Sequence, residues 1–227
     1  MVLVEARRVL AVAWKDATAE RRTKANFNAV VFLAAAILLL FGFALGPERE
    51  ALQRAAGGVI WLTVLFAGVL SFNRSYEQEL ESGALEMLLL YPGDRRSIFL
   101  GKLLANFMFV VLVEAIMLPT AAVLYDLPVV RYALPLGGVL LLGTIGFVTL
   151  GTFYAAMASR LRAREVLLPL LLFPMLIPLL VACVEATAAV LTGDAMGDAG
   201  SWMRLLAVFD VVFFVAAYLA FEHVIEG

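Results

Sequence analysis

Six long apolar segments constrain this chain more than any other feature of its sequence. They lie near residues 27–45, 57–72, 103–125, 133–156, 165–184 and 205–222. At a rise of about 1.5 Å per residue, a helix of about 20 residues crosses the roughly 30 Å hydrocarbon core of a bilayer. Lipid cannot hydrogen-bond an exposed backbone, and these runs are longer than the roughly ten alternating residues of a barrel strand. The sequence therefore predicts an all-α integral membrane protein with six transmembrane helices.

Composition supports this class and one domain over residues 1–227. Of the 227 residues, 63% are hydrophobic and 16% are charged, whereas a soluble domain carries about 25% charged residues. The second apolar run is short, and we expect it to extend at its start. The single cysteine, Cys183, excludes an internal disulfide and a cysteine metal cluster. Residues 1–24 lack the uninterrupted apolar stretch of a secretory signal peptide.

The distribution of lysine and arginine predicts the orientation of the spans. Thirteen of the 17 basic residues lie in the first 24 residues, the loop after the second span and the loop after the fourth span. Only four lie on the opposite side: Arg49, Arg54, Arg131 and Arg204. Short loops rich in lysine and arginine stay in the cytoplasm, so both termini are expected there.

Residues 1–24 have the pattern of an amphipathic helix. Apolar residues recur at spacings of three and four, while charged residues take the other faces. The apolar stripe consists of Leu3, Ala6, Leu10, Ala13 and Ala17. We expect this helix to lie flat at the membrane surface; the alternative is an ordinary basic flank to the first span.

Small residues and prolines within the spans predict how the helices pack. Gly42 and Gly46 form a small-xxx-small pair, which would let two helix backbones approach closely. The fourth span has the same potential at Gly137, Gly138, Gly143, Gly146 and Gly151. The fifth span contains Pro169, Pro174 and Pro178, each of which removes a backbone donor, so a kink or a local break is expected.

Residues 73–102 form a cytoplasmic loop with an unusual composition. Its centre reads SYEQELESGALEMLLLYPGDRR, with four glutamates around a short apolar segment. Ser75 and Gln78 fit a capping box, which predicts that a helix begins there. The apolar segment predicts a short helix that either docks on a cytoplasmic partner or rests its leucines in lipid, and periodicity alone slightly favours lipid.

This loop resembles the haem exporter B family, the permease of the cytochrome c maturation pathway. The resemblance lies in an Arg-aromatic-acid pattern, then acid-x-Gly-x-Leu-Glu-x-Leu, a proline, and a lysine at the next span. The matching residues are Arg74, Tyr76, Glu79, Glu81, Gly83, Leu85, Glu86, Leu88, Pro92 and Lys102. Met87 and Tyr91 depart from the glutamine and serine often expected at those positions. Span number and the amphipathic start agree over the whole chain, but only this loop is specific to the family.

The resemblance implies the membrane subunit of an ABC transporter in a bacterial inner membrane. The loop would be the coupling helix that docks on a separate ATPase subunit, with Arg74, Glu79, Glu81, Gly83, Leu85, Glu86, Leu88 and Pro92 as the coupling residues. The chain itself is not expected to be an enzyme, because no GxxxxGK[ST] loop occurs and Gly101-Lys102 is followed by leucine. An ATPase pair would call for two membrane halves, so a homodimer is expected, together with other cytochrome c maturation proteins.

Few residues are suited to bind haem, the cargo that the resemblance implies. The only histidine, His223, ends the last span, Cys183 lies in an apolar run, and the methionines show no paired arrangement. We therefore expect no directly bound cofactor, with haem held mainly by partner subunits.

Two acidic residues lie within predicted spans. Glu114 is midway along the third span and Asp210 is in the sixth. A carboxylate at the bilayer centre costs about 2.5–3.5 kcal/mol, so such residues face the bundle interior or water. Glu114 also matches an acid of the resembled family. For both residues the alternative is a protonated or hydrogen-bonded packing role, which we favour for Asp210.

Two other functions remain open at this point. One is an ABC-2 type permease for a polysaccharide, a lipid or a drug, which shares the amphipathic start, the six spans and an acidic coupling helix. The other is a membrane scaffold that transports nothing. The loop motif favours the haem pathway over the general permease, but no cargo site is visible in the sequence.

Overall fold

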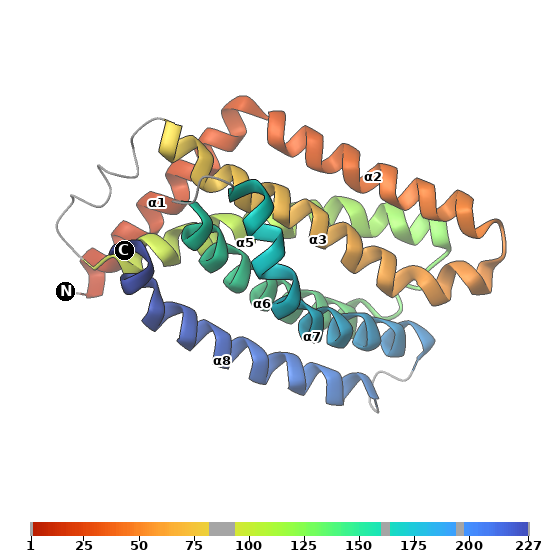
Figure 1. The fold of residues 1–227 in the computed structure, drawn as a ribbon. Helices are drawn as coiled ribbons and strands as arrows, with labels where there is room; N and C mark the ends of the chain where they lie inside the picture. Colours follow the sequence, from red (N-terminus) through yellow and green to blue (C-terminus); the bar gives the residue numbers. More distant parts are fainter. Residues whose placement is uncertain (1, 82–93, 160–163, 194–197, 227) are drawn as a thin grey trace.

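Helices make up nearly all of the described chain in a computed structural model, which describes residues 2–81, 94–159, 164–193 and 198–226 (Figure 1). They are α1 (Val2–Thr23), α2 (Ala25–Leu45), α3 (Arg49–Glu81), α5 (Arg96–Tyr125), α6 (Ala133–Ser159), α7 (Arg164–Thr192) and α8 (Asp198–Glu226). These residues contain no strand, so the prediction of an all-α protein is confirmed.

Six of these helices are long and apolar enough to cross a membrane, as predicted. The candidate spans are Asn26–Leu45, Arg49–Tyr76, Arg96–Tyr125, Ala133–Ser159, Leu167–Thr192 and Asp198–Val224. The two ends of the chain lie at the same end of the bundle, as an even number of spans requires (Figure 1). The second span extends beyond the predicted run in both directions, and with 28 residues it is long enough to cross.

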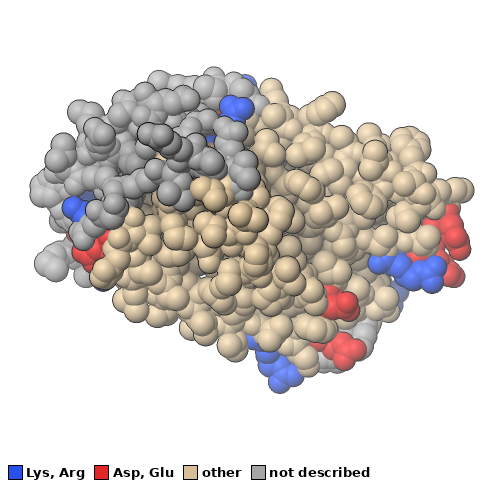
Figure 2. Space-filling model, viewed as in Figure 1, with Lys and Arg blue, Asp and Glu red and all other residues tan. Residues whose placement is uncertain are grey.

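The interior of the bundle is built on α3 and α6. In the most apolar window of α3, 72% of the residues are buried, against 17% in α2. Large apolar side chains stay exposed on the outer helices, among them Phe32, Phe43 and Val211. Figure 2 shows the consequence on one face, a broad surface without charge between charged patches. Such a surface suits contact with lipid, and the chain is a multi-pass membrane protein.

Three glycines of α6 allow close helix contacts, as the sequence predicted. A Cβ at Gly143 would lie 2.1 Å from the ring of Trp61 in α3, and one at Gly151 would lie 2.0 Å from the ring of Phe72. A Cβ at Gly146 would lie 2.4 Å from a carboxylate oxygen of Asp210 in α8. Large side chains of α3 and α8 thus occupy the space that a side chain on α6 would need.

The predicted small-xxx-small pair in α2 is wrong. Gly46 does not pack against a helix; it caps the C-terminal end of α2 with a φ of 72°, and no atom lies within 4 Å of its virtual Cβ. Gly42 contacts the ring of Tyr125 at an ordinary 3.4 Å. The spacing of four residues arose from a helix end, where glycine is favoured because it tolerates positive φ.

Two local sequence signals do not lead to the helix start and the helix break that they suggest. α3 continues through Ser75 to Glu81, so Ser75 and Gln78 do not begin a helix. α7 is one helix through Pro169, Pro174 and Pro178, so the predicted local break is absent from Arg164–Thr192, whereas a kink stays a prediction. In both cases the local sequence signal is overridden by a long helix whose apolar face is packed in the bundle.

The N-terminal helix forms as predicted, but its packed face overlaps the predicted stripe only in part. Val12 and Ala13 are buried, and a Cβ at Gly101 of α5 would lie 2.6 Å from the Cβ of Val12. Leu10 and Trp14 point outward, with 59% and 71% of their surfaces exposed. α1 thus packs against α5 through one narrow face. Its two large apolar side chains, Leu10 and Trp14, lie mostly outside that contact.

Candidate functional site

The predicted coupling residues lie where α3 ends and α5 begins. Arg74 is an exposed residue near the end of α3, and the backbones of Glu79 and Glu81 belong to the last turns of that helix. The other five predicted coupling residues lie outside the described residues: Gly83, Leu85, Glu86, Leu88 and Pro92. The described structure therefore shows the two helices that bracket the coupling segment.

A buried lysine joins three helices at this end of the bundle. The side chain of Lys102 in α5 is completely buried, and its ammonium donates to the carbonyl oxygen of Ser75 in α3 at 2.8 Å. It also contacts Ser75 Oγ and Asp16 Oδ2 of α1, each at 3.3 Å, and lies 4.4 Å from the ring centre of Tyr76. We call Lys102, Asp16, Ser75 and Tyr76 the Lys102 cluster.

The Lys102 cluster gives a buried cation the partners that it needs. An unpaired buried ammonium would carry a large desolvation cost, whereas an anion, two oxygen acceptors and an aromatic face offset that cost. Asp16 is itself held by Lys15 at 3.0 Å, so the acid connects two lysines. The cluster thereby ties α1 to the start of α5 and to the end of α3.

Glu114 is an intramembrane acid with a hydrogen-bond partner. Its side chain on α5 is buried, and Thr144 Oγ1 of α6 donates to Glu114 Oε1 at 2.6 Å. Its burial places this acid toward the bundle interior, one of the two environments expected for an acid within a span. Hydrogen bonds between membrane helices contribute about 0.6 kcal/mol on average and at most about 1.7 kcal/mol, so this contact is a modest link between α5 and α6.

Asp210 is an intramembrane acid without such a partner. It is as buried as Glu114, with 6% of its surface exposed, yet neither carboxylate oxygen has a hydrogen-bond partner in the described residues. One of the oxygens lies against Gly146 of α6, where only the missing Cβ makes room for it. Asp210 therefore faces the bundle interior, one of the two environments expected for it, but without the hydrogen bonds that normally accompany a buried acid.

The candidate haem ligands are not brought together. His223 is exposed at the end of α8, and Cys183 is buried in α7. Glu222, the neighbour of His223, pairs instead with Arg96 of α5 at 3.2 Å. Within the described part of the chain, no three His, Cys, Asp or Glu side chains form a group suited to a metal ion.

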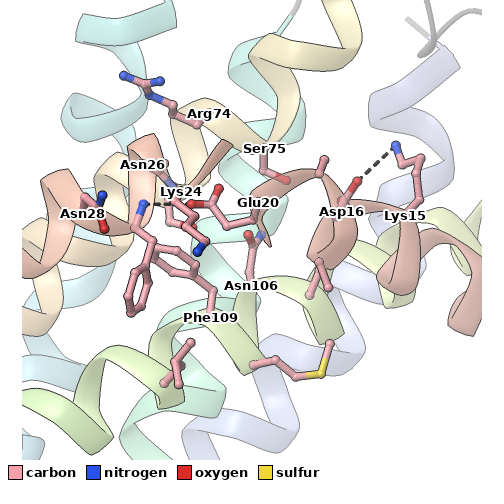
Figure 3. A pocket seen from close by; sticks show the side chains of 17 residues that line it. Lys15, Asp16, Glu20, Lys24, Asn26, Asn28, Arg74, Ser75, Asn106 and Phe109 are labelled. Carbon is pink, nitrogen blue, oxygen red and sulfur yellow. Dashed lines mark hydrogen bonds and ion pairs between the residues drawn. The ribbon is translucent and has the colours of Figure 1, made fainter. Parts of the chain in front are cut away.

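A cavity of about 940 Å³ opens beside the Lys102 cluster, where the end of α1 meets the first turns of α2 (Figure 3). Its lining combines polar and charged side chains with apolar ones. Its charged residues are Lys15, Asp16, Glu20, Lys24 and Arg74. Glu20 Oε1 accepts a hydrogen bond of 2.8 Å from the backbone N–H of Phe27, which fixes the turn between α1 and α2.

Comparisons with known proteins identify the family. The family described as "CcmB protein" matches residues 7–227, nearly the whole chain. The chain belongs to the CcmB protein family. This membership confirms the resemblance inferred from residues 74–102. It is also consistent with the six candidate spans of a membrane subunit.

Individual CcmB relatives support the assignment. The chain is 35% identical over 186 residues to the heme exporter protein B of Pseudomonas aeruginosa, covering 82% of each chain. It is 37% identical over 149 residues to that of Rhodobacter capsulatus, covering 66% of this chain and 68% of the relative. With the protein of Paracoccus denitrificans the identity is 31% over 172 residues, covering 76% and 78%.

Sequence reasoning missed three partners of the buried polar groups. It singled out Lys102 and Glu114 but did not assign Asp16, Ser75 or Thr144 to them. Asp16 lies 86 positions before Lys102, and Thr144 lies 30 positions after Glu114. No local pattern pairs these residues, because each partner belongs to a different helix.

Proposed function

We propose that this chain is the membrane subunit of an ATP-driven transport complex in c-type cytochrome biogenesis. A separate ATPase would hydrolyse ATP, and the chain would couple that reaction to haem export or to the release of a haem-loaded chaperone. The observation that carries the proposal is membership of the CcmB family over residues 7–227, together with the named relatives. Haem is the cargo in this proposal and not a resident cofactor.

The Lys102 cluster supports a route from the coupling segment into the bundle. A force applied between residues 82 and 93 would act on the end of α3 and the start of α5, because these helices flank that segment. Lys102 links both helices to α1 through Ser75 and Asp16. The three helices would then move together as a rigid unit when the ATPase pair closes.

Substitutions in the coupling segment test this function. Replacing Leu85 or Glu86 with arginine should abolish cytochrome c maturation, because it would place a cation in an apolar or acidic contact of the ATPase. Matched controls at the opposite end are Val130→Arg, at a residue that is 92% exposed, and Glu50→Arg, at an exposed glutamate. Normal expression with full maturation in both loop variants would contradict the coupling role.

We propose that the protein works as a homodimer with an ATPase pair, other maturation proteins and lipid around it. Affinity purification of the tagged chain from native membranes, with mass spectrometry, should recover a small ATPase with a Walker A loop and haem-handling proteins. Recovery of glycan, lipid or drug machinery would support the general ABC-2 permease instead. Recovery of no ATPase, even after cross-linking at residues 82–92, would favour a scaffold.

The orientation is a further part of the proposal. Both termini would lie in the cytoplasm of a bacterial cell, with the protein in the inner membrane, because 13 of 17 basic residues lie on that side. Green fluorescent protein fused to either terminus should fluoresce, whereas alkaline phosphatase should be inactive at both. Active phosphatase at either terminus would reverse the topology.

We also propose that Glu114 takes part in the transport cycle. It is a buried acid held by Thr144 in the middle of the span, a position where acids are retained for function more often than for stability. Replacing Glu114 with glutamine keeps the shape and should impair cytochrome c maturation. Normal maturation at normal expression would leave it a packing residue. Asp210→Asn offers the same test for the second acid, for which a packing role is favoured.

A further inference from the structure

We propose that the cavity between α1, α2, α3 and α5 binds one anionic phospholipid. Its phosphate would lie at Lys24, with Arg74 adding attraction at the edge, and its acyl chains would follow α5 into the bilayer. This binding site depends on neither the ATPase partner nor the cargo.

The cavity lies at the depth of the lipid head groups. It includes Asn26 and Ser75, which are at or next to the ends of the candidate spans Asn26–Leu45 and Arg49–Tyr76. Met108 and Leu112 of α5 also line the cavity and lie deeper along the span Arg96–Tyr125. The polar wall thus lies at the membrane surface and the apolar wall within the bilayer, which is the arrangement of a phospholipid.

The charges of the cavity favour an anion. Asp16 is neutralised by Lys15 and Lys102, and Glu20 accepts from the backbone of Phe27. Lys24 and Arg74, by contrast, form no ion pair with any described residue. Figure 3 shows Lys24 among the lining residues near the centre of the view and Arg74 on α3 at its edge. Basic pockets between membrane helices on the cytoplasmic side are suited to anionic head groups.

A buried amide adds polar recognition beside these cations. Asn26, at the start of α2, is 4% exposed and lines the cavity, and its side-chain oxygen has no hydrogen-bond partner among the described residues. Such an oxygen would accept a hydrogen bond from a hydroxyl of a glycerol head group. The cost of leaving it unpaired would then be removed by the ligand.

The apolar wall leads out of the cavity toward lipid. Met108 and Leu112 of α5 line the cavity and are 44% and 51% exposed, on the side of the helix that the bundle does not cover. Phe27 and Phe109 close this wall with an edge-to-face contact, their ring centres 6.2 Å apart. Acyl chains would therefore leave the cavity along α5 without crossing a polar surface.

The lining fits a phospholipid better than a porphyrin. Haem iron is usually ligated by His, Cys, Met or Tyr, and among the described residues that line the cavity only Met108 carries such a group. A phosphate needs no such ligand, because a cation and hydrogen-bond donors are sufficient. The volume of about 940 Å³ is at the upper end of the roughly 300–1,000 Å³ of small-molecule sites, which suits a head group and the upper part of its chains.

Native mass spectrometry of the full-length protein tests the proposal with two defined lipids. Phosphatidylglycerol and phosphatidylcholine of the same chain length would be titrated into the detergent-solubilised protein. Phosphatidylglycerol should bind more tightly. The double variant Lys24→Gln/Arg74→Gln should lower its affinity by about tenfold, toward that of phosphatidylcholine. The matched control Arg54→Gln/Arg131→Gln removes two basic residues at the opposite end of the bundle and should keep the preference.

A second measurement locates the bound lipid by cross-linking. A photoactivatable phosphatidylglycerol should cross-link to residues 105–112 of α5, and Ala105→Trp, which fills the cavity, should abolish that cross-link. Equal affinity for both lipids, equal losses in the test and control variants, or cross-links confined to other helices would overturn the proposal. Haem in place of lipid at residues 105–112 would overturn it as well.

Discussion

Lys102 and Asp210 are both charged residue types inside the bundle, and their surroundings differ completely. Lys102 has an anion, two oxygen acceptors and an aromatic ring around its ammonium, which come from two other helices. Asp210 is almost as buried but has no hydrogen-bond partner among the described residues. Lys102 therefore connects the ends of three helices. Asp210 only occupies the space beside Gly146 of α6, and no described residue hydrogen-bonds to it.

This difference separates two meanings of a buried charge in a membrane protein. A saturated group such as Lys102 stabilises the fold, so its loss should be seen first as instability. An unsatisfied group such as Asp210 contributes little to stability, so a loss of function on its replacement would point directly to a role in transport. Glu114 lies between these extremes, with one hydrogen bond.

The largest effect is expected for Lys102→Met. The substitution keeps an unbranched chain one atom shorter but leaves Asp16 without its buried partner, and the free energy of unfolding should fall by about 2–4 kcal/mol. This loss of free energy is smaller than the one expected for breaking a fully buried ion pair. Asp16 keeps its contact with Lys15, and its side chain is 17% exposed. Denaturation in mixed micelles measures it. Leu103→Met is the matched control, and equal stability of the two variants would show that the cluster is not structural.

Gly146→Ala should have the next largest effect. The new methyl group would lie 2.4 Å from an oxygen of Asp210 and 2.8 Å from Leu179, so overpacking should lower the free energy of unfolding by about 1–3 kcal/mol. Gly137→Ala on the same helix meets no atom within 4 Å and should be neutral or stabilising. Replacing Asp210 with alanine in the Gly146 variant should recover part of the loss; no recovery would mean that Asp210 does not fill this space.

Thr144→Val removes the hydrogen bond to Glu114 and should cost about 0.6–1.7 kcal/mol. Thr149 offers a close control, because it is a buried threonine of the same helix whose hydroxyl has no partner in the described residues. Thr149→Val should leave the free energy of unfolding unchanged or raise it slightly. If Thr149→Val lowered the free energy of unfolding more than Thr144→Val, a hydrogen-bonded hydroxyl would not stabilise the fold more than an unbonded one, and the distinction would be wrong.

The smallest effect is expected for Asp210→Asn. The side chain keeps its shape, and no hydrogen bond is lost, so the free energy of unfolding should change by less than about 0.5 kcal/mol. Thermal unfolding of the purified protein would measure it. A loss above about 1 kcal/mol would show that Asp210 has a partner in the assembled protein, for example a second copy of the chain.

The sequence predicted the number and type of the helices better than their ends. All six spans were predicted. An apolar run that is long enough to cross the bilayer is stable inside it only as a helix. The ends were missed where local signals conflicted with packing. Ser75 looked like the start of a helix, yet its carbonyl oxygen accepts a hydrogen bond from Lys102 in the interior of α3. Gly46 looked like a packing residue and is a helix cap.

The sequence predicted which residues belong to the candidate site, but not how they are arranged in space. The motif singled out Arg74 and Lys102, and burial cost singled out Glu114 and Asp210, all from the sequence alone. The structure places Arg74 at a cavity and Lys102 in a cluster, while Gly83, Leu85, Glu86, Leu88 and Pro92 lie outside the described residues. The cavity itself has no sequence signature, because its walls come from four separate helices.

The sequence by itself determined that this is a six-span membrane protein of the CcmB family, because hydrophobic length and a local motif need no knowledge of neighbours. Only the tertiary structure decided which buried polar groups are satisfied. Lys102 contacts Asp16, 86 positions earlier, whereas the carboxylate of Asp210 lies against Gly146 and has no hydrogen-bond partner among the described residues. That outcome depends on which helix faces meet, and in a bilayer small residues and single hydrogen bonds select those faces, since hydrophobicity is the same on every side.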